Sequence, residues 1–278
     1  MTDLFIGVVS HERSRFTDAQ GSEGVAARLA HAWTGLGLSS RVQINTRDLV
    51  SESGIDITPE VIGDSPAEEL RIERQWAQFL ERPMGPGWWG AHALRWSKYW
   101  ASHRGTPDPA SVTRLLNIEL SHVDLMQSAL DSDSSWLLLL EDDAGCSDIA
   151  DLAKGLRGLV SGATTPRFAN LSQSFDLDRL GVSHLLQPAA GAPWQGSASR
   201  SVLTFRRPVT NTVCAIMYRR DFLADLMAEW RSLPMTPVAP IDWKLNRALM
   251  GLWASGDIRP GDCWWVEPGP IVQRSMHA

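Results

Sequence analysis

The chain has only three cysteines among its 278 residues, and it has no long hydrophobic run. Cys146, Cys214 and Cys263 show neither a CxxC motif nor the Cys/His spacing of a zinc site, so we expect reduced thiols and a cytoplasmic protein. A membrane helix needs about 18–20 consecutive apolar residues, and no stretch approaches that length. The first residues also lack the basic and apolar regions of a secretion signal. We therefore expect no transmembrane segment and no secretion signal.

An excess of positive charge is also missing. The 26 Lys and Arg residues are outnumbered by 32 Asp and Glu residues, for a net charge of −6. A nucleic-acid-binding protein needs a basic face, so we expect no nucleic acid as a partner. A composition of 44% hydrophobic and 21% charged residues is ordinary for a globular protein. A chain of this length can form one large α/β domain, or a core domain with a small subdomain.

What the chain does have is a run of apolar residues that leads straight into three carboxylates, WLLLLEDD at residues 136–143. The run predicts a strand buried on both faces, with the acids at its end. Alternation along a strand would direct Glu141 and Asp143 to one side and Asp142 to the other. Carboxylates this close repel one another unless a cation or hydrogen-bond donors hold them. Mg²⁺ or Mn²⁺ suits such a pair, and a solvated acidic turn that caps a helix is the alternative.

The first fifty residues predict a strand at residues 4–10, a helix at 25–36 and a second strand at 40–45, which together make one βαβ unit. Ligands of open α/β sheets gather beyond the carboxyl ends of the strands. Ser10, Arg13 and Asn45 follow or end these strands and are therefore candidate nucleotide contacts, with arginine suited to a diphosphate through its planar fork. A solvated loop is the alternative for this region.

Two more candidate residues lie on helices further along the chain. His122 is inside a helix predicted at residues 109–130, where a histidine is more often structural than catalytic. Asp242 stands between apolar residues at the start of a helix predicted at residues 244–253. It could cap that helix, or act as the general base that removes a proton from an acceptor hydroxyl.

The region between these helices predicts strands and a loop. Residues 201–205 and 211–218 suit strands, which we expect to form an antiparallel pair near the site. Residues 188–201 are rich in Gly, Ala and Ser and predict a flexible connection, with Trp194 bordering an acceptor.

Several of these motifs resemble one enzyme family. Leu120-Ser121-His122, followed about fifteen residues later by LLLLEDDA, is similar to the "LSH … LILEDD" block of bacterial lipooligosaccharide-type glycosyltransferases. This is glycosyltransferase family 25, a GT-A-fold family that also includes collagen galactosyltransferases. The later stretches TVCAIMYRRDFLADL at 212–226, APIDW at 239–243 and PGPIVQRS at 268–275 resemble further elements of the family in the same order. The resemblance covers about residues 112–278.

The resemblance implies an α/β fold of GT-A (Rossmann-like) type, with a mixed, mostly parallel central sheet flanked by helices. It implies a single domain over residues 1–278, with a nucleotide-binding half up to about residue 145 and an acceptor-binding half from 146. The implied activity is metal-dependent transfer of a hexose, galactose or glucose, from a UDP-type nucleotide sugar to a hydroxyl of a glycan or small-molecule acceptor, with inversion. Mn²⁺ or Mg²⁺ would be the cofactor.

The resemblance also implies residue roles. Asp143 would bind the metal directly, Glu141 or Asp142 would ligate it or contact the ribose, and His277, a late histidine, would complete the metal site. The face of the helix that bears His122 would approach the nucleotide, and Asp242 would be the general base. A metal-dependent phosphoesterase or nucleotidyltransferase and an inactive nucleotide-sugar-binding partner module are the alternatives. The oligomeric state is left open.

Overall fold

The structure, a computed structural model, describes residues 3–11, 14, 16, 18, 21–57, 74, 75, 77–80, 109–173, 183–189, 194–210, 212–233 and 240–276. Arg13 and His277, two of the predicted site residues, lie outside the described residues.

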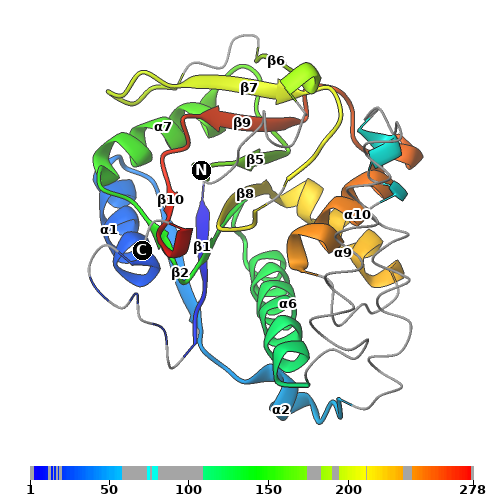
Figure 1. The fold of residues 1–278 in the computed structure, drawn as a ribbon. Coiled ribbons are helices and arrows are strands. Elements are labelled where there is room, and N and C mark those ends of the chain that lie inside the picture. Colours follow the sequence, from blue (N-terminus) through cyan, green and yellow to red (C-terminus); the bar gives the residue numbers. More distant parts are fainter. Residues whose placement is uncertain are drawn as a thin grey trace.

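An eight-stranded sheet crosses the molecule in the order β2-β1-β3-β8-β5-β9-β7-β6 (Figure 1). Its strands are β1 (Leu4–Val9), β2 (Ser40–Asn45), β3 (Trp136–Glu141), β5 (Phe168–Asn170), β6 (Leu186–Pro188), β7 (Ser201–Phe205), β8 (Ala215–Arg219) and β9 (Cys263–Glu267). Two short strands, β4 (Ala144–Gly145) and β10 (Val272–Gln273), form a separate antiparallel ribbon. The α/β class is therefore as predicted.

The prediction of a mostly parallel sheet is wrong. β1 is parallel to β2 and β3, and β5 is parallel to β9, but the four other neighbouring pairs are antiparallel. β8 lies between β3 and β5 and runs opposite to both. The predicted pairing of the strands near residues 201–205 and 211–218 is also wrong, because β7 pairs with β6 and β9. Local periodicity identifies a strand, but the neighbour and direction of a strand depend on tertiary packing.

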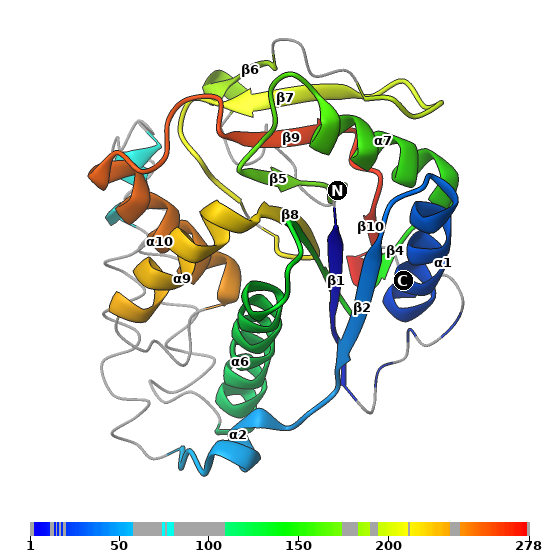
Figure 2. The same ribbon diagram turned by 180° about the vertical axis from the view of Figure 1, so that it is seen from behind.

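Helices cover both faces of the sheet. They are α1 (Ser22–Gly35), α2 (Leu49–Ser53), α6 (Pro109–Asp131), α7 (Ile149–Ser161), α9 (Arg220–Ser232) and α10 (Ile241–Ser255), with the 3₁₀ turns η1 (Ser183–Leu185) and η2 (Arg274–Met276). α1 and α7 lie side by side on one face, and α6, α9 and α10 lie on the other (Figures 1 and 2). None of the described helices combines the length and the hydrophobicity that a membrane crossing requires.

The central strand β3 is buried on both faces, as its apolar run predicts. Leu137 and Leu139 pack into the cluster that contains the apolar side chains of α9 and α10. Leu138 and Leu140 alternate with them and pack into the cluster of α1 and α7. Full burial of one such leucine stabilises the fold by about 1.5–3 kcal/mol. This strand therefore joins the two cores, and its carboxylate end is held in a fixed place.

The βαβ unit of β1, α1 and β2 aligns three strand ends. The parallel register places Val9 opposite both Asn45 on β2 and Glu141 on β3. Ser10, Asn45 and Glu141 consequently meet at one edge of the sheet, where ligands of open α/β sheets bind.

The segment before β7 is packed rather than flexible. Trp194 is only 8% exposed, and its indole N–H donates to Asp151 Oδ2 over 3.2 Å. The Ala198 N–H donates to the same carboxylate over 2.8 Å. Burial alone would raise the pKa of Asp151, but the hydrogen bonds from Ala198, Trp194, Arg200 and Ser197 together lower it. The prediction of a flexible connection is therefore wrong for residues 194–200.

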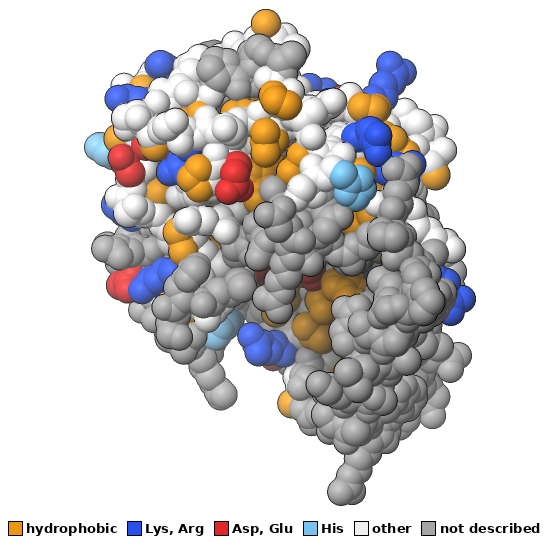
Figure 3. Space-filling view, turned by 45° about the horizontal axis from the view of Figure 1, so that its top comes forward, with side chains coloured by type: hydrophobic (Ala, Val, Ile, Leu, Met, Phe, Trp, Pro, Cys, Tyr) orange, Lys and Arg blue, Asp and Glu red, His pale blue; other side chains and the backbone are white. Residues whose placement is uncertain are grey.

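The face of the molecule nearest β6 and β7 carries a mixed surface. In the space-filling view of Figure 3, Lys and Arg side chains are interspersed with Asp, Glu and hydrophobic side chains. Among the described residues on this face, Lys and Arg side chains are more widespread than Asp and Glu side chains.

Candidate functional site

Polar side chains that sequence patterns single out connect the ends of β1 and β2 to neighbouring helices. Ser10 is buried, and its Oγ donates to Glu23 Oε1 over 3.2 Å. Asn45 is 2% exposed, its Nδ2 donates to Asp124 Oδ2 over 3.0 Å, and its Oδ1 accepts from the Arg47 N–H over 3.1 Å. The structure thus brings both residues to the predicted edge, where they already take part in local hydrogen bonds. Their contact with a nucleotide stays a prediction.

The three carboxylates Glu141, Asp142 and Asp143, here called the acidic turn, follow β3 at this edge. β3 ends at Glu141, and the next two residues form a turn into β4, so strand alternation does not extend past Glu141. The carboxylates nevertheless have different surroundings. Asp142 faces the loop after β1, where its Oδ2 accepts from Ser14 Oγ over 2.9 Å and lies 3.2 Å from His11 Nε2.

Glu141 faces α6. Its Oε1 lies 3.7 Å from Nε2 of His122, which is only 1% exposed. This separation is too long for a hydrogen bond, and neither ring nitrogen of His122 has a hydrogen-bond partner among the described residues. Buried polar groups in proteins usually have such partners, so an unpaired buried imidazole beside a carboxylate is unusual. The structure therefore brings His122 to the acidic turn, and its approach to a nucleotide stays a prediction.

Asp143 is the most buried of the three acids, at 5% exposure. Its Oδ2 accepts a hydrogen bond from Ser275 Oγ, and its backbone oxygen accepts one from the Arg274 N–H over 2.9 Å. Its Oδ1 is buried and has no hydrogen-bond partner among the described residues. The Cys214 thiol also interacts with the Asp143 carboxylate as a hydrogen-bond donor, but a thiol is only a weak donor. Burial first, and then the charges of Asp143 and Glu141, raise the pKa of Cys214.

Asp242 approaches the acidic turn from α10. It is the second residue of the helix, after Pro240 in the N-cap position, and its side chain is half-buried. Burial and the negative charge of Glu141 raise the pKa of Asp242 to about 7. The influence of Glu141 means that these two carboxylates, far apart in the sequence, lie close together in the fold. Asp242 is therefore placed beside the acidic turn, with a pKa suited to proton transfer near neutral pH.

Two polar contacts hold the first turns of α10. Asn246 is one helical turn after Asp242, and its Oδ1 accepts from the Thr210 N–H over 2.8 Å. The ammonium of Lys244 forms a buried ion pair with Glu119 on α6, which also accepts from the Trp230 indole over 3.3 Å. Because these groups satisfy one another, they restrict how α10 can rotate against α6 and against the segment that contains Thr210.

The acidic turn offers a partial set of ligands for a hard cation. A buried carboxylate oxygen without a partner costs free energy, and a cation bound to Asp143 Oδ1 would remove that cost. Among the described residues, no group of three or more His, Cys, Asp or Glu side chains is arranged to hold a metal ion. Mg²⁺ is commonly bound through one or two carboxylates, with water and substrate phosphates as its other ligands. Asp143 fits that mode of binding.

Four residues of this edge were not singled out from the sequence. His11 and Ser14 contact Asp142, while Arg274 and Ser275 contact Asp143. His11 and Ser14 could have been predicted, because they follow β1 at the end of the sheet where ligands gather. No local pattern indicates that Arg274 and Ser275 lie beside Asp143; only the resemblance, which assigns His277 to the same metal site, implies that the carboxyl-terminal residues lie there.

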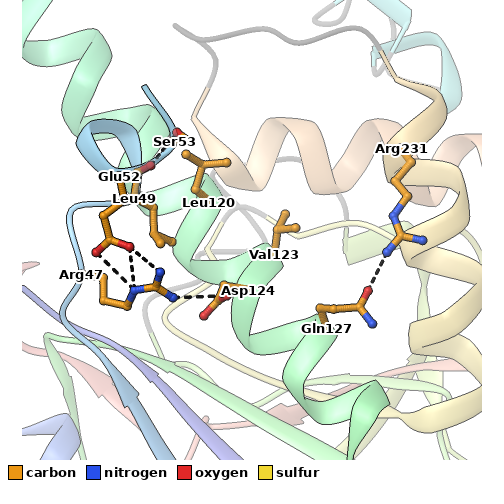
Figure 4. Close-up of a pocket in the computed structure, with 9 residues that line it drawn as sticks. All are labelled: Arg47, Leu49, Glu52, Ser53, Leu120, Val123, Asp124, Gln127 and Arg231. Carbon is orange, nitrogen blue, oxygen red and sulfur yellow. Dashed lines mark hydrogen bonds and ion pairs between the residues drawn. The ribbon is translucent and has the colours of Figure 1, made fainter. Parts of the chain in front are cut away.

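A groove of about 460 Å³ lies apart from the acidic turn, between α2, α6 and α9 (Figure 4). Arg47 in this groove is paired with Glu52 and lies 3.8 Å from Asp124, while Arg231 donates to Gln127 over 2.6 Å. The groove contains no residue of the acidic turn, so we place the candidate site at the turn.

Comparison of the chain with protein-family models and with curated proteins finds no match.

Proposed function

We propose that this chain is a metal-dependent glycosyltransferase that moves a hexose from a UDP-type nucleotide sugar to a hydroxyl of a glycan or small-molecule acceptor. The observation that carries the proposal is the meeting of two kinds of carboxylate at one sheet edge. Asp143 has an unpartnered buried oxygen suited to a cation, and Asp242 has a pKa near 7 suited to a general base. An inverting transfer of a sugar to a hydroxyl uses a base for the acceptor and a group that stabilises the leaving diphosphate.

The leaving group of the reaction explains the first carboxylate. When the bond between the anomeric carbon and the diphosphate oxygen breaks, negative charge develops on the nucleoside diphosphate. A bound Mn²⁺ or Mg²⁺ would offset that charge as a Lewis acid, an effect worth several kcal/mol in the transition state. Asp143 would be its protein ligand, with Glu141 or Asp142 ligating through water or contacting the ribose.

The acceptor explains the second carboxylate. As the acceptor oxygen forms its bond to the anomeric carbon, its proton passes to a carboxylate oxygen of Asp242. A base with a pKa near the working pH is most effective, because it is both available and strong enough. Attack from the side opposite the leaving diphosphate inverts the anomeric centre. Ser10, Asn45 and His122 surround the strand ends on which the nucleotide would lie.

The test is to incubate the protein with UDP-galactose, UDP-glucose and other sugar nucleotides in the presence of Mn²⁺, and to identify the products. Release of nucleoside diphosphate from one donor, abolished by EDTA, is expected. Release of nucleoside monophosphate would instead favour the phosphoesterase or nucleotidyltransferase alternative. Binding of a donor without any turnover would favour an inactive partner module. If no donor raises the melting temperature or is consumed, the proposal is wrong.

The Asp143→Ala variant tests the metal role directly. Among the described residues it removes the one carboxylate that has a buried oxygen without a hydrogen-bond partner, so we expect loss of Mn²⁺-dependent turnover with the fold retained. Circular dichroism and the melting temperature check the fold. Normal turnover by this variant would show that the site is wrongly assigned.

A further inference from the structure

The carboxyl-terminal segment of the described chain is built into the acidic turn. β10 pairs antiparallel with β4, with Gln273 opposite Ala144, immediately after the turn. The next two residues, Arg274 and Ser275, both contact Asp143. We call residues 272–275 the carboxyl-terminal clamp.

We propose that the carboxyl-terminal clamp positions Asp143 for the cation, with Ser275 holding one carboxylate oxygen so that the other is presented as a ligand. This inference rests on the proposed function, because it concerns the same cation.

The two oxygens of Asp143 differ in a way that supports this role. Ser275 Oγ donates to Oδ2, and a charge-assisted hydrogen bond of this kind fixes the rotation of the carboxylate. Oδ1 is thereby left buried and without a partner among the described residues. Groups that hydrogen-bond to metal ligands typically change metal affinity 10–100-fold when they are removed. Ser275 has the geometry of such a positioning residue.

Arg274 connects the clamp to the loop after β1. Its guanidinium donates to both carboxylate oxygens of Asp18, over 2.9 and 3.0 Å, and lies 5.1 Å from the centre of the Phe16 ring. Its backbone N–H donates to the Asp143 oxygen. The same loop contacts Asp142 through Ser14. Arg274 therefore connects Asp143 of the acidic turn to Asp18 of the loop after β1.

The experiment measures Mn²⁺ binding rather than turnover. Binding of Mn²⁺, alone and with UDP, is followed by the electron paramagnetic resonance signal of the free ion. Ser275→Ala is expected to weaken Mn²⁺ binding about tenfold or more, whereas Ser275→Thr, which keeps the hydroxyl, is expected to bind nearly as the unaltered chain does. Ser275 is exposed, so its alanine variant should fold, and the melting temperature verifies this.

Ser255 provides a matched control. Its Oγ also donates to an aspartate oxygen, Oδ2 of Asp257, but at the far end of α10. Ser255→Ala is expected to leave Mn²⁺ binding unchanged. If Asp143→Ala loses binding while Ser275→Ala binds as tightly as the unaltered chain, the clamp inference is wrong and the proposed function stands. If the unaltered chain binds no Mn²⁺, or Asp143→Ala binds it normally, both are wrong.

Discussion

Replacing Asp242 with asparagine is expected to stabilise the fold at alkaline pH while removing activity. The pKa of this carboxyl is raised from its ordinary 3.8 to about 7, by burial and by the charge of Glu141. The folded state therefore holds a proton that the unfolded state releases. Stability falls as the pH rises from about 4 to about 7, and the full cost is present above pH 7.

The size of the effect follows from the same values. A rise in pKa from 3.8 to about 7 corresponds to roughly 4 kcal/mol of cost once Asp242 is ionised. Asp242 keeps some contact with solvent, and screening by that solvent lowers the cost to about 2 kcal/mol. Asparagine has nearly the same shape and carries no charge, so the Asp242→Asn variant should gain this amount at pH 8. For a chain of this size the gain corresponds to a rise of roughly 5 °C in melting temperature.

The assay compares the melting temperatures of Asp242→Asn and the unaltered chain at pH 4.5 and at pH 8. Most of the gain in stability should be absent at pH 4.5 and present at pH 8. Asp221 is a matched control, because it occupies the first turn of α9 as Asp242 occupies that of α10. Hydrogen bonds from Arg219 lower the pKa of Asp221. Its ionised form therefore stabilises the fold above its unfolded pKa, and Asp221→Asn should lower the melting temperature at pH 8. Equal melting temperatures of Asp242→Asn and the unaltered chain at pH 8, or an equal gain at both pH values, would refute the reasoning.

Two further predictions follow from the structure. In a pH–rate profile, transfer activity of the unaltered chain should rise with pH through about 7 as Asp242 ionises. Activity should be about 10²–10⁴-fold lower in Asp242→Asn. In Glu141→Gln the rise in activity should come at a lower pH, because the charge of Glu141 helps to raise the pKa of Asp242. Gly155→Ala on α7 should destabilise the fold by about 1–3 kcal/mol in urea unfolding, because its Cβ would lie 2.0 Å from the Trp194 ring. Gly35→Ala on α1, where the new Cβ meets no atom within 4 Å, should instead be neutral or stabilise by up to about 1 kcal/mol; equal effects of the two alanines would contradict the packing argument.

Residues close in sequence account for what could be predicted. The apolar run before Glu141 predicts a strand buried on both faces, and β3 is buried in that way. The helix predicted at residues 109–130 is α6, Pro109–Asp131. Both predictions rest on burial patterns within a few turns or residues, which local spacing records.

The missed features all involve residues far apart in the chain. The direction of β8 depends on how the segment before Ala215 returns to the sheet between β3 and β5, and no local pattern encodes that path. The contact of Ser275 with Asp143 spans 132 positions. The proximity of Asp242 to Glu141 was expected only through the family resemblance. Site geometry of this kind arises from tertiary packing, which a single sequence does not display.

The contacts of Lys244 and Asn246 hold Asp242 beside Glu141 in spite of the cost of ionising it. A carboxylate held beside Glu141 in a half-buried place is unfavourable, and α10 could relieve it by turning away. Lys244 and Asn246, two and four residues further on, oppose that motion through the pair with Glu119 and the hydrogen bond with Thr210. A buried ion pair contributes little net stability, but breaking one leaves an uncompensated charge. Rotation of α10 would break the pair of Lys244 and Glu119, and this would cost more free energy than moving Asp242 away from Glu141 would recover. Asp242 therefore stays beside the acidic turn.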